Sequence, residues 1–212
     1  NMMVSSDVLA DFAATAEVTG VKQGDLATKF RDVGFSIASV GDQMMDVVKI
    51  AQQAGTTVAA VSEGVVGNLD KMNLYNFEGG VKGLAKMAAQ ASMLRFDMQE
   101  TFNFAEKVLT PEGAIETAAG LQRLGVSIGN LTDPFALMNQ SLTDPSGLQD
   151  SIIKAAKQFT EFDEKTKTFK INPQGVLMLR EIEQEAGMSA GSLSKAALAA
   201  ADLDKRISAI SP

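Results

Sequence analysis

The sequence predicts a mainly all-α protein, an irregular multi-helix bundle of short helices with one small β-hairpin near residues 158–172. Three observations predict this fold class. Apolar residues recur at helical spacing along most of the chain. Every internal proline follows a side chain that can cap a helix start. Several glycines, usually followed by an apolar residue, stand where helices should end. Because 45 % of the 212 residues are apolar, the chain can also bury a packed core.

Four glycines are expected to end helices with a left-handed backbone, and the residue after each should fold back on the ending helix. These glycines are Gly20, Gly55, Gly125 and Gly187. An aliphatic residue stands six positions after each glycine and is expected to begin the next helix: Leu26, Val61, Leu131 and Leu193. The intervals between the four copies are irregular, which favours a shared helix–turn–helix pattern over a solenoid of fixed period.

Four proline pairs mark helix starts in the second half of the chain. Each joins a capping side chain to a proline at the first helical position, where no backbone N–H is needed. The pairs are Thr110–Pro111, Asp133–Pro134, Asp144–Pro145 and Asn172–Pro173.

Between these marks, four apolar stripes predict buried helix faces. They are Met44, Val47, Val48, Ala51 and Ala54; Val81, Leu84, Ala88 and Ala91; Ile152, Ala156 and Phe159; and Leu179, Ile182 and Ala186. The alanines permit close helix approach, and the 11 methionines of the chain suit irregular gaps. Core packing is therefore favoured over a ligand site for each stripe.

One stretch, from Gln158 to Asn172, departs from helical spacing. Residues alternate around Phe169 after a polar turn at 163–166, which predicts two short antiparallel strands. Two strands alone are only marginally stable in water, so Phe169 and Ile171 are expected to pack on neighbouring helices.

Irregular stretches elsewhere suggest boundaries near residues 76 and 143, giving segments 1–76, 77–142 and 143–212. The composition does not change across either boundary, so one continuous domain stays open.

Composition removes many kinds of active site. The chain has no cysteine and no histidine, which excludes disulfides, thiolate or imidazole metal ligands, and nucleophiles that depend on histidine. The net charge of −7 argues against specific nucleic-acid binding, and no apolar run is long enough to cross a bilayer. We therefore expect no enzyme, no cofactor and no bound metal.

The carboxylates Glu181, Glu183 and Glu185 are the nearest approach to a glycosidase pair. An acid catalyst needs an apolar pocket to raise its pKa, and these residues are expected on a solvated helix face instead.

Two other motifs also have simpler explanations. Ser194 and Lys195 are adjacent and would point about 100° apart on a helix, so they do not form a nucleophile–base pair. The glycines around Lys82 lack the preceding strand and the Ser/Thr of a phosphate-binding loop. They are expected to form a turn before a helix that starts near Val81.

Several strings resemble phage tail tape-measure proteins, over about residues 40–210. In chain order they are Asn68–Asn73, Tyr75–Phe77, Gly80–Leu84, Pro111–Glu116, Gly120–Gln122, and Asp133–Met138 with Asp144–Pro145 after it. The hairpin and the helix from Val176 to Gly187 continue the likeness.

The resemblance implies a virion structural protein that is made in the host cytoplasm and placed in the lumen or tip of the phage tail. Such proteins take part in tail assembly, determine tail length, and leave before or with the DNA during ejection. The resemblance also implies a homo-oligomer related to a trimer or hexamer, with tail-tube and tail-tip or baseplate proteins as partners. Because Gly and Pro interrupt the helices here, a globular piece near one end is expected rather than the long ruler. The first residue, Asn1, suggests a chain that begins inside a longer protein.

Apolar side chains on outer helix faces would make the contacts in that role. The candidates are Met2, Met3, Phe12, Met93, Leu94, Phe96 and Met98, with ordinary core packing as the alternative for each. Two other functions stay open. A non-phage all-helical adapter or regulatory domain would be a stable monomer, and a tail-associated muralytic domain would act on purified cell wall.

Overall fold

The computed structural model describes residues 6–126 and 128–210. These residues form eleven α-helices, two short 3₁₀ helices and one two-stranded antiparallel sheet, so the predicted mainly all-α class with a small hairpin is confirmed. The chain divides into two compact units, residues 1–92 and 93–212, and each is described by itself.

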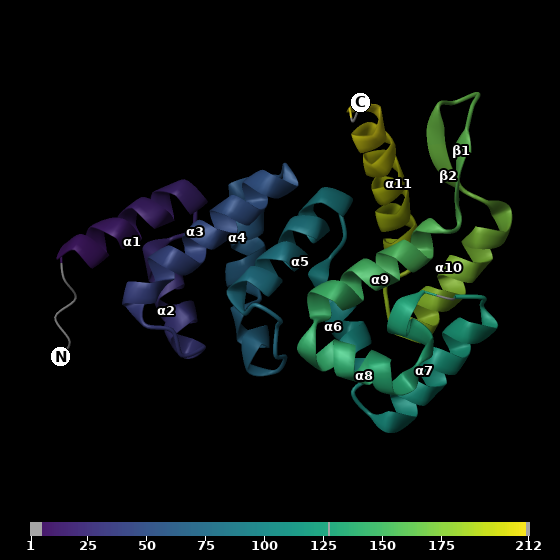
Figure 1. The fold of residues 1–212 in the computed structure, drawn as a ribbon, viewed down its shortest axis with the longest axis horizontal. Helices are drawn as coiled ribbons and strands as arrows, with labels where there is room; N and C mark the ends of the chain where they lie inside the picture. Colours follow the sequence, from purple (N-terminus) through teal and green to yellow (C-terminus); the bar gives the residue numbers. More distant parts are fainter. Residues whose placement is uncertain (1–5, 127, 211–212) are drawn as a thin grey trace. The chain divides into compact units, whose positions relative to one another are not determined.

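Unit 1 is a group of helices around α3 (Figure 1). Its elements are α1 (Ser6–Thr19), α2 (Gln23–Asp32), α3 (Ile37–Ala54), α4 (Val58–Gly67), the 3₁₀ helix η1 (Leu69–Asn73) and most of α5 (Val81–Leu94). Helices α1, α2 and α4 all pack against α3. The buried face of α3 holds the predicted residues from Met44 to Ala51 and extends one turn earlier to Val40, whereas Ala54 at the end of the helix is only half-buried. This face is the centre of the unit's apolar core.

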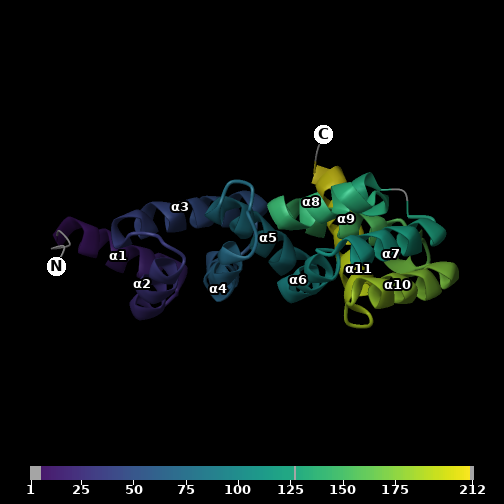
Figure 2. The same ribbon diagram turned by 90° about the horizontal axis from the view of Figure 1, so that it is seen from below.

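Unit 2 holds the remaining helices and the hairpin. Its elements are α6 (Met98–Lys107), α7 (Pro111–Arg123), the 3₁₀ helix η2 (Gly129–Thr132), α8 (Pro134–Thr143), α9 (Pro145–Lys157), β1 (Thr160–Asp163), β2 (Thr168–Ile171), α10 (Pro173–Ala186) and α11 (Ser192–Ile210). Helix α11 packs on α9 and against both strands, and α7 packs on α8 and α10. Figure 2 shows α7 and α10 side by side.

The predicted helix ends have the expected backbone. Gly20, Gly55, Gly125 and Gly187 have φ of +72°, +71°, +76° and +68°. The residue after each of Gly55, Gly125 and Gly187 donates its backbone N–H to the carbonyl oxygen five residues earlier. The N···O distances are 3.0, 3.0 and 2.7 Å. The aliphatic residues that follow are all buried. Leu131 is an exception to the helix prediction, because it lies in η2 and not in an α-helix. The next α-helix begins only at Pro134, whose ring fixes the first helical φ.

The four prolines are the first residues of α7, α8, α9 and α10. Each preceding side chain accepts a hydrogen bond from the backbone N–H three residues on. The donors are Gly113 to Thr110 at 3.1 Å, Ala136 to Asp133 at 2.9 Å, Gly147 to Asp144 at 2.8 Å and Gly175 to Asn172 at 2.6 Å. These bonds satisfy N–H groups that have no partner within the helix.

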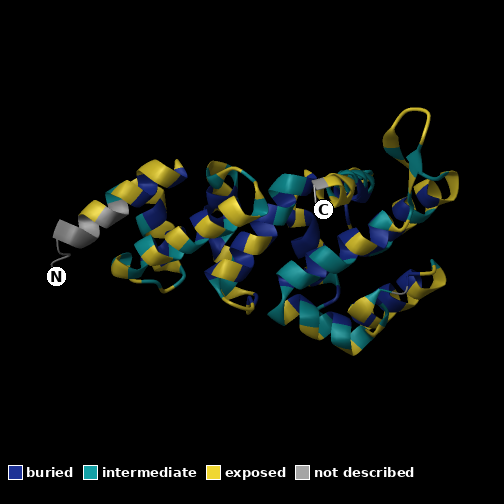
Figure 3. Ribbon diagram, turned by 45° about the horizontal axis from the view of Figure 1, so that its top comes forward, coloured by how far each residue is buried: buried dark blue, intermediate teal, exposed yellow. Residues whose placement is uncertain are grey.

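The hairpin pairs Phe162 with Phe169, and their rings meet edge to face with centroids 5.1 Å apart. The ammonium of Lys205, on α11, lies 2.9 Å from the centroid of the Phe162 ring. Phe169 and Ile171 are both half-buried, and β2 packs against α11, in agreement with the expected helix packing. The turn between the strands is exposed (Figure 3).

The division of the chain between residues 92 and 93 does not coincide with the boundaries expected near 76 and 143. The stretch after η1 leads into α5 within unit 1, and α8 and α9 pack together across residue 143 within unit 2. An irregular sequence marks a helix end, whereas a boundary requires that few contacts cross it. Sequence irregularity alone does not report those contacts.

Candidate functional site

The candidate contact residues fall into three groups. Met2 and Met3 lie outside the described residues, as does the side chain of Phe12. Leu94, Phe96 and Met98 are buried, as the core-packing alternative requires, and are not exposed for a partner. Met93 is half-buried and lines a groove in unit 2.

Glu183 is not on the solvated face of α10, where its charge and spacing placed it. It is only 3 % exposed and accepts backbone N–H bonds from Gly191 at 2.8 Å and Leu193 at 2.9 Å. These donors stand at the start of α11, so a carboxylate from one helix caps the next. The sequence prediction was wrong here, because spacing along α10 does not reveal that the chain turns back over it.

Two side chains of α6 also hold the region between α10 and α11. Glu100 is buried and accepts the N–H of Ser189 at 2.9 Å. Lys107 donates its ammonium to the backbone carbonyl of Glu185. The region between α10 and α11 is therefore fixed by charged groups from two different helices. These two residues carry no sequence signal, because their partners lie 89 and 78 positions away.

Glu181 and Glu185 line a hollow of about 370 Å³ between α7 and α10. The other lining residues are Gly120, Arg123, Leu124 and Gln184. The carboxylate of Glu185 lies against the backbone of Gly120, where an added Cβ would stand 3.1 Å from its Cδ. The hollow thus combines two carboxylates and a guanidinium with the apolar side chain of Leu124.

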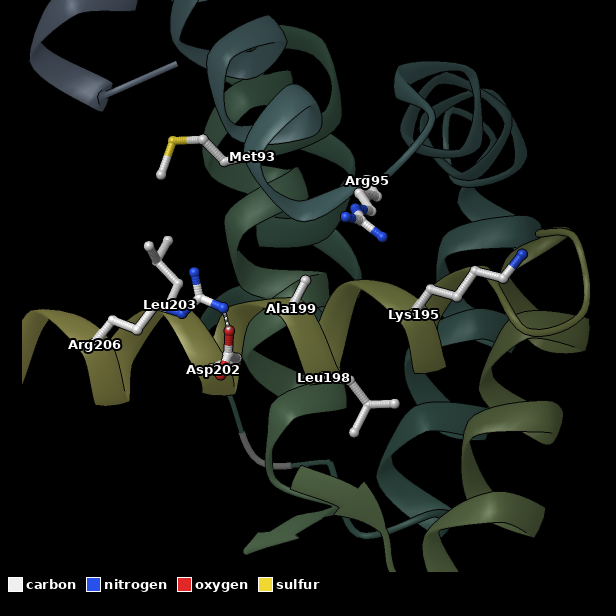
Figure 4. A pocket seen from close by; sticks show the side chains of 8 residues that line it. All are labelled: Met93, Arg95, Lys195, Leu198, Ala199, Asp202, Leu203 and Arg206. Atoms are coloured by element: carbon white, nitrogen blue, oxygen red, sulfur yellow. Dashed lines mark ion pairs between the residues drawn. The ribbon is translucent and has the colours of Figure 1, made fainter. Parts of the chain in front are cut away.

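A second, larger cavity of about 590 Å³ lies along α11 in unit 2 (Figure 4). Its lining residues are Met93, Arg95, Lys195, Leu198, Ala199, Asp202, Leu203 and Arg206. Asp202 and Arg206 form an ion pair at 2.6 Å. Lys195 belongs here with the apolar side chains of α11 and not to a pair with Ser194. We refer to this cavity as the α11 groove.

Large apolar side chains are exposed on several helices of unit 2. Ile115 is on α7, Phe135 is on α8, and Val176 and Leu177 are on α10. Phe135 is the most exposed of them, at 75 %. Single exposed apolar residues are common, but a phenyl ring with most of its surface in water is an available contact for a partner.

The described part of the chain holds no group of three or more Asp, Glu, His or Cys residues that could bind a metal. No helix among residues 6–126 and 128–210 combines the length and apolarity that a bilayer crossing requires. Gly79 and Gly80 form the turn before α5, with φ of +78° and +62°, whereas Gly83 lies within the helix.

No protein-family model, curated protein or solved structure matches this chain.

Proposed function

We propose that this chain is a structural segment of a phage tail tape-measure protein, located in the tail lumen or tail tip and acting by packing against copies of itself or against tail proteins. The proposal depends on the resemblance of the strings from Asn68 to Gly187 to that family. One structural observation supports it. The strings Pro111–Glu116 and Asp133–Met138, and the helix from Val176, each expose a large apolar side chain.

Phe135 is the centre of this argument. It follows the capped start of α8, so its backbone is held while its ring stays in solvent. Leu142 lies seven residues later on the same helix and is also exposed. Residues at this spacing share one helix face, so α8 offers an apolar row with its other side packed on α7 and α9. A rigid aromatic anchor next to an aliphatic side chain is the kind of feature that protein interfaces use.

The location is tested on virions. Antibody raised against residues 93–212 should label the tails of the phage that encodes the chain, and peptides of the chain should appear in mass spectra of purified particles. Absence from purified virions contradicts the proposal. The flanking sequence of the gene gives an independent test, because a tape-measure protein should continue for hundreds of helical, Gly/Ala-rich residues.

The contact surface is tested with Phe135→Ser. Because the ring is mostly exposed, the melting temperature should change little, in keeping with about 0.5 kcal/mol or less for surface substitutions. Light scattering should show an oligomer for the original chain and a smaller species for the variant. Glu112→Ser, at an exposed position of α7, is the matched control. A stable monomer for the original chain favours the adapter alternative instead.

The muralytic alternative has its own observation, the paired Glu181 and Glu185 in the hollow beside Arg123. Incubation of the chain with purified cell wall tests it. Release of soluble sugar that is lost on Glu181→Gln would establish an enzyme. If no soluble sugar is released, the muralytic alternative is rejected and the structural role stays the proposal.

A further inference from the structure

We infer that the α11 groove binds an amphipathic organic anion, a phosphate or carboxylate group carried on an apolar chain. The groove belongs entirely to unit 2. Its volume of about 590 Å³ is within the range of roughly 300–1,000 Å³ that is typical of small-molecule sites. This inference does not depend on the tape-measure proposal.

The groove is formed by one face of a helix whose opposite face is already packed. Lys195, Ala199, Asp202 and Arg206 recur at intervals of three or four residues, so they lie along one side of α11, and Leu198 lines the groove next to Ala199. The buried residues Leu193, Ala196, Ala197, Ala200 and Ala201 interleave with them, and α11 packs on α9. The groove side of the helix therefore keeps half-exposed apolar surface at Leu198, Ala199 and Leu203.

The groove lining has a net positive charge, whereas the net charge of the whole chain is negative. The lining contains three cations and one carboxylate, in a chain with a net charge of −7. Asp202 is paired with Arg206. Within the part of the chain that the structure describes, neither Arg95 nor Lys195 forms an ion pair, so both cations are available to an anion. Figure 4 places Arg95 and Lys195 toward one end of the groove and the Asp202–Arg206 pair toward the other, with Ala199 between them. This arrangement suits a ligand with a charged head and an apolar tail.

The backbone of Arg95 gives a second, independent reason. Arg95 directly follows the end of α5 and has a φ of +53°, a conformation that side chains with a Cβ rarely adopt. The helix ends described above use glycine at such positions. A strained residue in a cavity is a reason to infer a role for its side chain. Arginine also interacts favourably with the carboxyl end of a helix, so the test must separate binding from this structural effect.

The binding test uses the full chain labelled with ¹³C at its methionine methyl groups. Octyl phosphate and octanoate are titrated separately, below their micelle concentrations, and the Met93 methyl signal is assigned with Met93→Leu. We expect a saturable shift of that signal. Octanol lacks the charge and inorganic phosphate lacks the apolar chain, so both should bind at least about tenfold more weakly. Equal binding of octanol and octyl phosphate overturns the proposal.

A vesicle-binding experiment distinguishes a free soluble anion from a lipid headgroup. Phosphatidylglycerol vesicles are sedimented with the chain under the same conditions. Binding of free octyl phosphate without sedimentation supports a soluble ligand. Sedimentation with both probes supports the same chemistry presented by a lipid headgroup. Sedimentation without a Met93 shift for free octyl phosphate overturns the groove as the site.

Three variants separate binding from folding. Arg95→Gly and Lys195→Gln should each weaken octyl phosphate binding about tenfold, because each removes one charged partner of the anion. Arg95→Gly should leave the melting temperature unchanged or raise it by a few degrees, since glycine relieves the left-handed strain. Lys167→Gly is the matched control, because Lys167 is also a cation with positive φ, at +57°, but lies in the exposed hairpin turn. Unchanged affinity in Arg95→Gly and Lys195→Gln overturns the proposal.

Discussion

Replacement of Glu183 by alanine should destabilise unit 2 far more than its helical position suggests. In the structure its two carboxylate oxygens accept the N–H groups of Gly191 and Leu193, at 2.8 and 2.9 Å. Glu183→Ala removes both acceptors at the start of α11. The N–H of Leu193 is in a fully buried residue, whereas Gly191 is half-exposed. Water can therefore replace the bond to the N–H of Gly191 more readily than the bond to the N–H of Leu193.

The magnitude follows from these two bonds. A buried donor left without a partner costs roughly 1–3 kcal/mol, and loss of a helix N-cap costs about 1 kcal/mol. We expect the free energy of unfolding of unit 2 to fall by about 2–4 kcal/mol. Glu183→Gln keeps one acceptor oxygen but turns an amide NH₂ toward the other N–H, so its loss should be intermediate.

The assay is urea unfolding followed at the backbone amide signals of α11, which reports unit 2 alone. With a denaturant slope of about 2 kcal/mol per molar urea, the midpoint for Glu183→Ala should fall by roughly 1–2 M. Amide hydrogen exchange at Leu193 should also quicken. Glu181→Ala, on the exposed side of the same helix, is the control and should shift the free energy by less than about 0.5 kcal/mol. Equal midpoints for the Glu183 and Glu181 variants would refute the capping argument.

The remaining predictions concern the hairpin turn and two helical glycines. The backbone N–H groups of Lys165 and Thr166, and then Lys170, hold the pKa of Asp163 below its ordinary value of 3.8. Because the pKa of Asp163 is lower in the folded chain than in the unfolded chain, its ionised carboxylate stabilises the folded hairpin above about pH 3.8. This stabilisation is lost as the pH falls through the pKa of the folded state. Ring contacts between the paired strands, measured by NMR, should therefore weaken in strong acid, and Asp163→Asn should remove that dependence while keeping the turn. Gly175→Ala should destabilise unit 2 by about 1–3 kcal/mol, because the new Cβ would lie 2.6 Å from the Cβ of Phe159. Gly24→Ala, at an open position of α2, should instead stabilise the chain slightly. Thermal unfolding of both glycine variants beside the original chain checks these two expectations.

Local chemistry made the helix boundaries predictable. Asp133 and Pro134 act through bonds within three residues, so the start of α8 can be predicted without knowledge of the fold. The same holds for Gly55, whose left-handed φ of +71° follows from its missing Cβ. The hairpin was also predictable, because alternation of side chains and a polar turn are local patterns.

The sites were much less predictable. Glu183 looked like a surface charge, since a carboxylate between apolar neighbours on a helix usually faces water. Arg95 gave no sign that it would occupy a left-handed position next to a groove, because arginine is disfavoured there. The candidate contacts Leu94 and Phe96 were chosen for their apolar character, and that character equally describes core residues.

The helical class, the capped helix starts, the glycine helix ends and the position of the hairpin could all be predicted from local sequence. These features depend on hydrogen bonds and steric limits between residues a few positions apart. Long-range packing sets which apolar side chains remain exposed, which glutamates are buried, and which cations share a groove. Those outcomes depend on contacts between residues that are distant along the chain, such as Glu100 and Ser189, and no local pattern encodes such pairs.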